Sequence, residues 1–112
     1  MSLAQAASAP DPTVTDGDKY KVLLENEHVR VLSYTDAPGD RTQPHRHPAF
    51  VLHALGPFKR KLTFPDGRTA IREFQGGEVF YSAGEVHVGE NVGETPTRVL
   101  IVELKGAAMP RP

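Results

Sequence analysis

Apolar side chains along this chain fall into short runs that suit β-strands better than helices. The runs are rich in Val, Ile, Leu, Phe, Tyr and Thr, and some alternate between apolar and polar residues. Ten glycines and ten prolines divide the 112 residues and leave no room for a long helix. The predicted strands are 20–25, 28–34, a histidine segment within 39–47, 49–55, 58–64, 69–74, 78–81, 86–88 and 97–104. Short strands separated by frequent turns predict an all-β barrel or sandwich.

Two local signals support this pattern. Pro65, Asp66 and Gly67 lie between two strand-like runs, and a hairpin is expected there because Pro presets φ and Gly accepts a positive φ. The run 97–104 is almost continuously apolar, which predicts a strand buried on both faces. The length fits one domain, so we expect a flexible tail over 1–18, a barrel domain over 19–105 and a second tail over 106–112.

Composition narrows the classes of partner. The formal net charge is -1, which gives no electrostatic case for binding nucleic acid or an anionic membrane. The chain has no cysteine, so disulfides, thiolate metal sites and a cysteine nucleophile are excluded. No apolar run approaches the roughly 20 residues of a membrane helix, and the first residues do not form a signal peptide. We therefore expect a cytoplasmic protein whose partner is a small molecule.

Three histidines are the candidate functional residues. His45 and His47 lie two residues apart in the histidine segment, and side chains two apart on a strand share a face. His87 lies in a second Gly-rich segment that is also predicted to be a strand. Two imidazoles on one face, joined by a third from another strand, are a common way to bind a transition metal. The sequence therefore predicts a metal site formed by these three residues.

The spacing of these residues resembles the two motifs of the cupins. Gly39 stands six residues before His45, and Gly76 stands six before Ser82 in the segment that continues to His87 and Asn91. Two departures are clear. Ser82 stands where the second motif usually has proline, and the glutamate position of the first motif falls at Val51 or Leu52, neither of which binds metals.

The resemblance is to small single-domain bacterial cupins and covers most of the chain. It implies a double-stranded β-helix, that is a jelly-roll barrel, with the histidines pointing into the barrel mouth. It also implies one divalent transition metal (Fe, Zn, Ni or Mn) and a homodimer. A site with three histidines and no carboxylate leaves positions open and carries one more positive charge, which favours an anionic ligand.

Several further residues are candidates by position. His53 has the parity of His45 and His47 and could be a fourth ligand, and Glu85 has the parity of His87 and could bind the metal or orient an imidazole. Gln43 shares the parity of His45, is expected to line the mouth, and is a further candidate for a fourth ligand or for a residue that contacts the ligands. The candidate pocket wall is Phe50, Val51, Phe80 and Tyr81. For each of these residues, core packing or a solvated surface position is the competing interpretation.

Three functions remain open at this point. The first is a metal-dependent enzyme, a dioxygenase or an isomerase or lyase, acting on a small acidic metabolite. The second is a non-catalytic small-molecule-binding protein with a degenerate metal site, which the missing glutamate favours. The third is a barrel that serves only as a scaffold, because a fold does not fix a function.

Overall fold

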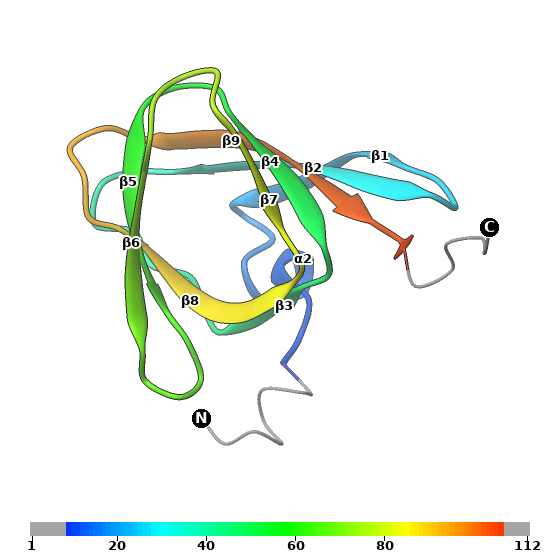
Figure 1. The fold of residues 1–112 in the computed structure, drawn as a ribbon, viewed down its shortest axis with the longest axis horizontal. Coiled ribbons are helices and arrows are strands. Elements are labelled where there is room, and N and C mark those ends of the chain that lie inside the picture. The colour runs from blue at the N-terminus through cyan, green and yellow to red at the C-terminus, as the bar shows by residue number, and fades with distance from the viewer. Residues whose placement is uncertain (1–8, 107–112) are drawn as a thin grey trace.

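The computed structural model describes residues 9–106, which form nine β-strands and one short helix (Figure 1). The helix is α2 (Pro12–Thr15), and no helix in the described range is long and apolar enough to cross a membrane. The strands are β1 (Tyr20–Glu25), β2 (Val29–Asp36), β3 (His45–His47), β4 (Phe50–Ala54), β5 (Phe58–Thr63), β6 (Thr69–Phe74), β7 (Val79–Ser82), β8 (Glu85–Asn91) and β9 (Thr97–Leu104). The predicted all-β fold is confirmed, with most strand limits within two residues of those expected.

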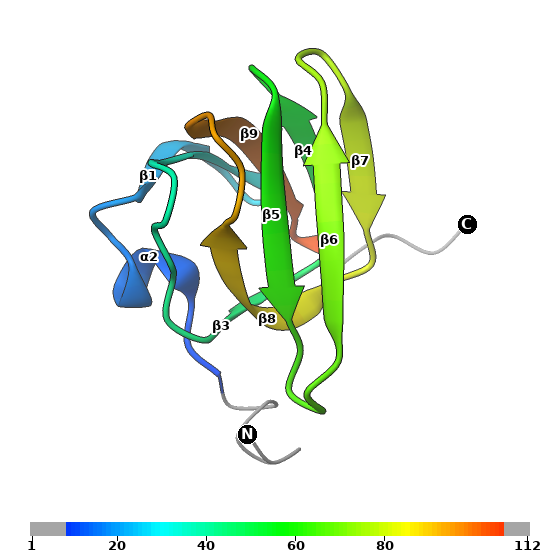
Figure 2. The same cartoon turned by 90° about the vertical axis from the view of Figure 1, so that its left-hand side faces the viewer.

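The strands form two antiparallel sheets that enclose the core. One sheet has five strands in the order β1-β2-β9-β4-β7, and the other has four in the order β3-β8-β5-β6. The two sheets lie face to face and close a jelly-roll barrel, which Figures 1 and 2 show from two directions. The hairpin expected at Pro65–Gly67 joins β5 to β6, with Gly67 at φ 88°.

Alternation along the strands decides which side chains enter the core. On β2, Leu32 and Tyr34 are buried while their neighbours are less so, and β9 buries Val99 and Ile101 in the same way. The core cluster also contains Tyr20, Phe50, Ala54 and Phe58. The expectation that 97–104 is buried on both faces is corrected, because its alternate residues are exposed or only half-buried. Nothing in the described chain covers the outer face of this sheet.

The N-terminal segment differs from the expected tail. Residues 1–8 lie outside the described range, but Asp11 caps α2 by accepting a hydrogen bond from the Thr13 backbone N–H at 2.9 Å. Pro12 follows at the first helical position, where proline is favoured, and it is buried. Asp11 also bonds Arg30 of β2 at 2.6 Å. The folded part of the chain therefore begins well before residue 19. Of the expected C-terminal tail, 107–112 lie outside the described residues.

Candidate metal centre

Strand pairing brings the three predicted histidines together. His45 and His47 lie on β3, which pairs with β8 so that His45 is directly opposite His87. All three side chains are buried, and a possible ligand nitrogen of each lies within 4.8 Å of those of the other two. The turn before β8 runs close against this strand. A Cβ on Gly84 would meet the His47 carbonyl oxygen at 3.2 Å, and Gly84 has φ 116°, so glycine is required there.

Each imidazole has one nitrogen directed at an acceptor outside the cluster. His45 Nδ1 lies 2.9 Å from the carbonyl oxygen of Gln43, and His47 Nδ1 lies 3.4 Å from Glu103 Oε2. His87 Nδ1 lies 2.9 Å from Glu85 Oε1, although not in line for a regular hydrogen bond. Metal-binding histidines almost always present one ring nitrogen to such an outer acceptor. This arrangement leaves the three Nε2 atoms available to a shared ligand.

Burial keeps the imidazoles of His45 and His87 neutral. Loss of solvation, with the neighbouring histidines, lowers the pKa of His45 to about 2. Loss of solvation also dominates at His87 and lowers its pKa to about 4, although the Glu85 carboxylate acts in the opposite direction. Neutral imidazole is the form that binds metals. Three buried imidazoles with oriented rings fit a divalent transition metal.

Glu85 lies directly behind His87 and is held by two other side chains. Arg72 of β6 bonds its two carboxylate oxygens at 2.7 and 3.1 Å, and Ser82 Oγ donates to Oε2 at 2.9 Å. Burial alone would raise the pKa of the Glu85 carboxyl, but His87 and Arg72 hold it well below its usual range. Glu85 is therefore a carboxylate that orients His87. The serine in place of the usual motif proline has a role here, because its hydroxyl fixes Glu85.

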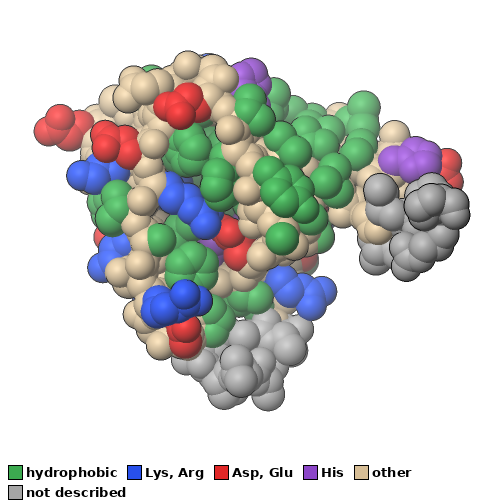
Figure 3. Space-filling model, viewed as in Figure 1, with side chains coloured by type: hydrophobic (Ala, Val, Ile, Leu, Met, Phe, Trp, Pro, Cys, Tyr) green, Lys and Arg blue, Asp and Glu red, His purple; other side chains and the backbone are tan. Residues whose placement is uncertain are grey.

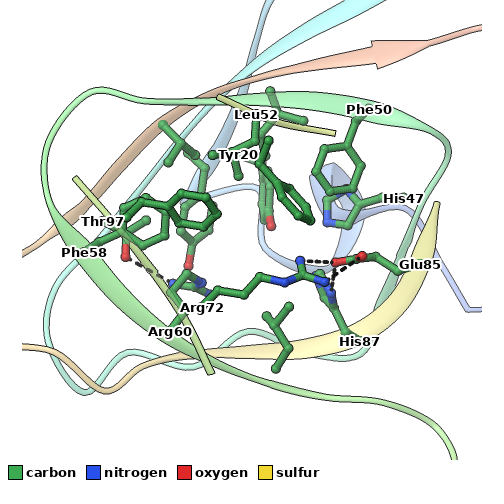
Figure 4. A pocket seen from close by; sticks show the side chains of 16 residues that line it. Tyr20, His47, Phe50, Leu52, Phe58, Arg60, Arg72, Glu85, His87 and Thr97 are labelled. Carbon is green, nitrogen blue, oxygen red and sulfur yellow. Dashed lines mark hydrogen bonds and ion pairs between the residues drawn. The ribbon is translucent and has the colours of Figure 1, made fainter. Parts of the chain in front are cut away.

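A cavity of about 50 Å³ opens beside the histidines and is walled mainly by aromatic and aliphatic side chains (Figure 4). Arg72 extends across the cavity to Glu85, and Arg60 lies at the side away from the histidines (Figure 4). The cavity is lined by Tyr20, Tyr34, His47, Phe50, Leu52, Phe58, Arg60, Leu62, Arg72, Phe74, Phe80, Glu85, His87, Thr97, Val99 and Ile101.

The remaining predicted site residues divide into two groups. Phe50 and Phe80 line the cavity as expected, and Glu85 lies beside His87. The side chains of His53, Gln43 and Tyr81 are exposed, and Val51 does not line the cavity. The expectations for His53, Val51 and Tyr81 are corrected.

The corrections have a physical cause. The parity argument for His53 assumed one continuous strand, but β3 and β4 belong to different sheets and the chain changes sheets at Pro48 and Ala49. The change shifts the inward face by one residue, so Phe50 and Leu52 point inward and His53 points outward. Gln43 precedes β3, and only its backbone carbonyl contacts the site. At the usual position of the motif glutamate, the inward residue is the apolar Leu52.

Sequence reasoning missed three residues around the histidines. The Tyr20 hydroxyl lies 3.4 Å from His45 Nε2, and burial raises its pKa, so it keeps its proton at neutral pH. Glu103 contacts His47 and is paired with Arg30 at 2.7 Å. Arg72 holds Glu85. Of these three residues, only Glu103 could have been found from the sequence. It is a carboxylate inside an otherwise apolar strand, and such a group needs a buried partner.

Comparisons with known proteins agree with this geometry at the level of the fold. No family model and no curated protein sequence matches the chain. Among solved structures, a cupin domain from Bordetella pertussis Tohama I matches with TM-score 0.70 and 25% identity, covering 77% of this chain and 91% of that chain. An RmlC-like cupin family protein with a double-stranded β-helix fold from Methanocaldococcus jannaschii matches with TM-score 0.61 and 17% identity, covering 76% and 77%. Bacillus subtilis oxalate decarboxylase, described with Mn(II) centers, matches with TM-score 0.53 and 23% identity, covering 69% of this chain and 22% of that one.

Proposed function

Because the chain is a small cupin-type domain, we propose that His45, His47 and His87 hold one divalent transition metal that acts on a small acidic molecule in the adjoining cavity. The observation that carries this proposal is the orientation of the rings. Each Nδ1 faces an acceptor outside the cluster, and the three Nε2 atoms are left for a common ligand. The possible ligand nitrogens of the three rings also lie within 4.8 Å of one another, close enough to share one ligand.

The charges around the site favour an anionic ligand. Glu85 is balanced by Arg72 and Glu103 by Arg30, so neither carboxylate neutralises a bound cation. When bound, a divalent metal supplies a Lewis acid and a template with open positions. A small acid fits both that charge and the size of the cavity. Manganese stands beside iron, zinc and nickel as a candidate, because the oxalate decarboxylase of similar fold has Mn(II) centers.

The chain's own side chains provide the surroundings that such chemistry needs. The aromatic walls, among them Phe50 and Phe80, exclude bulk water from the space beside the histidines. The Tyr20 hydroxyl can donate a hydrogen bond to a ligand atom near His45. We propose either an oxygen-dependent oxidation or an isomerase or lyase reaction, since three-histidine sites with open positions serve both classes.

Metal content is the first test. The untagged protein, dialysed against each of Fe(II), Mn(II), Ni(II) and Zn(II) under anaerobic conditions, should retain about one metal per chain. The His45→Ala/His47→Ala variant should retain almost none. The matched control is His28→Ala/His53→Ala, which removes two exposed histidines and should bind metal like the wild type. If the wild type retains none of the four metals, the proposal is wrong.

Leu52 supports a second candidate, a non-catalytic small-molecule-binding protein. It places an apolar side chain where the motif glutamate usually supplies a metal ligand. A metal bound here would therefore lack one ligand of the usual set, as expected for a degenerate site. The two functions separate in one assay. Turnover of small carboxylic acids that the His87→Ala variant lacks supports the enzyme, whereas saturable binding with no turnover in any metal form supports the binding protein.

A further inference from the structure

The segment that precedes β1, residues 9–18, lies against the histidine strand β3. Its helix α2 contacts both β3 and β1, and Figures 1 and 2 show α2 beside β3 from two directions. The Arg46 backbone N–H donates to the Pro10 carbonyl oxygen at 2.9 Å, and Pro12 is fully buried. The cavity opens on the other side, where Figure 3 shows a small histidine surface in a hollow between acidic and basic side chains. A ligand therefore reaches the histidines from one side, and this segment encloses them from the other.

Asp16 is the residue of this segment that reaches the histidine cluster. It is only 6% exposed, and its Oδ2 lies 3.9 Å from His45 Nδ1. Its two carboxylate oxygens accept from the backbone N–H of Gln43 at 3.1 and 3.3 Å. The carbonyl oxygen of Gln43 in turn lies 2.9 Å from His45 Nδ1. Asp16 therefore fixes the backbone group that orients His45, and it places a carboxylate behind the same ring.

The carboxylates around the cluster differ in how their charge is balanced. In the described part of the chain, Asp16, Glu85 and Glu103 each lie within 4 Å of a histidine ring nitrogen. Glu85 pairs with Arg72, and Glu103 pairs with Arg30, both at 2.7 Å. Asp16 pairs with no lysine or arginine among the described residues, and its hydrogen bonds come from a backbone N–H and a threonine hydroxyl. A carboxylate buried without a counter-charge is unfavourable, so a cation nearby is expected to complete it.

We propose that Asp16 is a positioning residue that provides a counter-charge to the metal held by His45, from outside the ligand set. This inference rests on the proposed metal site. The glutamate that cupins usually place among the ligands is replaced by the apolar Leu52, and Asp16 supplies a negative charge from behind His45 instead. A carboxylate behind a metal-binding imidazole makes that ligand more basic and strengthens its bond to the metal. One negative charge offsets only half of a divalent cation, so an anionic substrate is still favoured.

The proposal predicts opposite effects on stability and on metal binding. Asp16→Asn keeps the size of the side chain and an oxygen that accepts from Gln43, but it removes the charge. Without metal, this variant should melt at the same temperature as the wild type or higher, because it no longer buries an unbalanced charge. Its metal dissociation constant should rise by about tenfold or more, as is typical when a ligand loses its outer partner. A residue with a purely structural role would do the reverse, with a lower melting temperature and an unchanged affinity.

Three measurements on the full chain test these effects. Competition with a metal-binding dye gives the affinity for each of Fe(II), Mn(II), Ni(II) and Zn(II) that the wild type retains, and a thermal melt of the metal-free protein gives the stability. The visible absorption bands of bound Co(II) should also shift in Asp16→Asn, because His45 becomes a weaker ligand. Asp18→Asn is the matched control, since Asp18 belongs to the same segment but its side chain is 74% exposed and pairs with Lys19. The control should match the wild type in all three measurements.

Two results would overturn the proposal. One is that Asp16→Asn equals the control in metal affinity or in its Co(II) spectrum. The other is that its metal-free melting temperature falls together with the affinity, because a structural role then explains both losses. In either case the wild type still binds about one metal per chain, so the proposed function stands. A wild type that binds no metal removes the proposed function itself, and this inference with it.

Discussion

Two buried polar clusters lie on either side of the cavity, and they differ in whether the chain satisfies them. In the first, Asp36 accepts from Arg60 and from the Tyr34 hydroxyl, both at 2.5 Å, and from Asn91 at 3.0 Å. Thr97 completes this group, which lies away from the histidines (Figure 4). Every charge there has its partner within the protein.

The histidine cluster is only partly satisfied by the chain. His45 and His47 present Nδ1 to acceptors from the chain, and His45 Nε2 lies 3.4 Å from the Tyr20 hydroxyl. His87 Nδ1, in contrast, is buried without a regular hydrogen-bond partner among the described residues. A polar group buried without a partner is costly, so a ligand that completes the set is expected. The comparison shows that burial alone does not mark a function. Buried polar atoms that lack a partner on the chain mark it better.

The largest effect is expected from a substitution that disrupts the Asp36 cluster, in which every charge is paired. Asp36→Asn should lower the free energy of unfolding by about 3–5 kcal/mol, because it leaves the buried Arg60 guanidinium without its counter-charge. Chemical denaturation measures this change. The matched control is Asp66→Asn, which removes an exposed pair with Arg68 and should change stability by about 0.5 kcal/mol or less. A small loss for Asp36→Asn would show that this cluster does not stabilise the fold.

Added metal should stabilise the protein only through the histidine cluster. At a free metal concentration about 100 times its dissociation constant, the free energy of unfolding of the wild type should rise by about 2.7 kcal/mol. Asp36→Asn should keep this increment, whereas His87→Ala should lose it. Denaturation with and without metal gives both values. If Asp36→Asn also loses the increment, the two clusters are coupled and the comparison fails.

The site residues that lie close together in sequence could be predicted. The site residues that reach the site through long-range packing could not. The pairing of His45 with His47 follows from strand alternation alone, and the strands follow from β-forming runs between turns. The prediction for His53 failed because the change of sheet at Pro48 depends on the whole barrel. Tyr20 and Arg72 reach the site through tertiary packing, for which one sequence gives no signal. The outer face of β9 was misjudged because apolar residues on an exposed sheet face give the same sequence pattern as apolar residues in a core.

An intermediate effect is expected from the carboxylate behind His87. Glu85→Gln keeps the shape of the side chain but removes the charge that orients the imidazole and pairs with Arg72. Loss of such an outer partner typically weakens metal binding about 10–100-fold. Competition with a metal-binding dye measures the affinity. Glu73→Gln is the control, because Glu73 lies next to Arg72 in sequence but on the outer face of β6. An unchanged affinity for Glu85→Gln would exclude Glu85 from positioning His87.

The smallest effect is expected at Gln43, which contacts the site only through its backbone. Its carbonyl oxygen accepts from His45 at 2.9 Å, and its N–H donates to Asp16, while its side chain is exposed. Gln43→Ala keeps both backbone contacts, so metal affinity should change by about twofold or less and stability by about 0.5 kcal/mol or less. The dye competition used for Glu85→Gln gives the comparison directly. A tenfold loss would mean that the side chain enters the site when metal binds, and the ligand set would then extend beyond the three histidines.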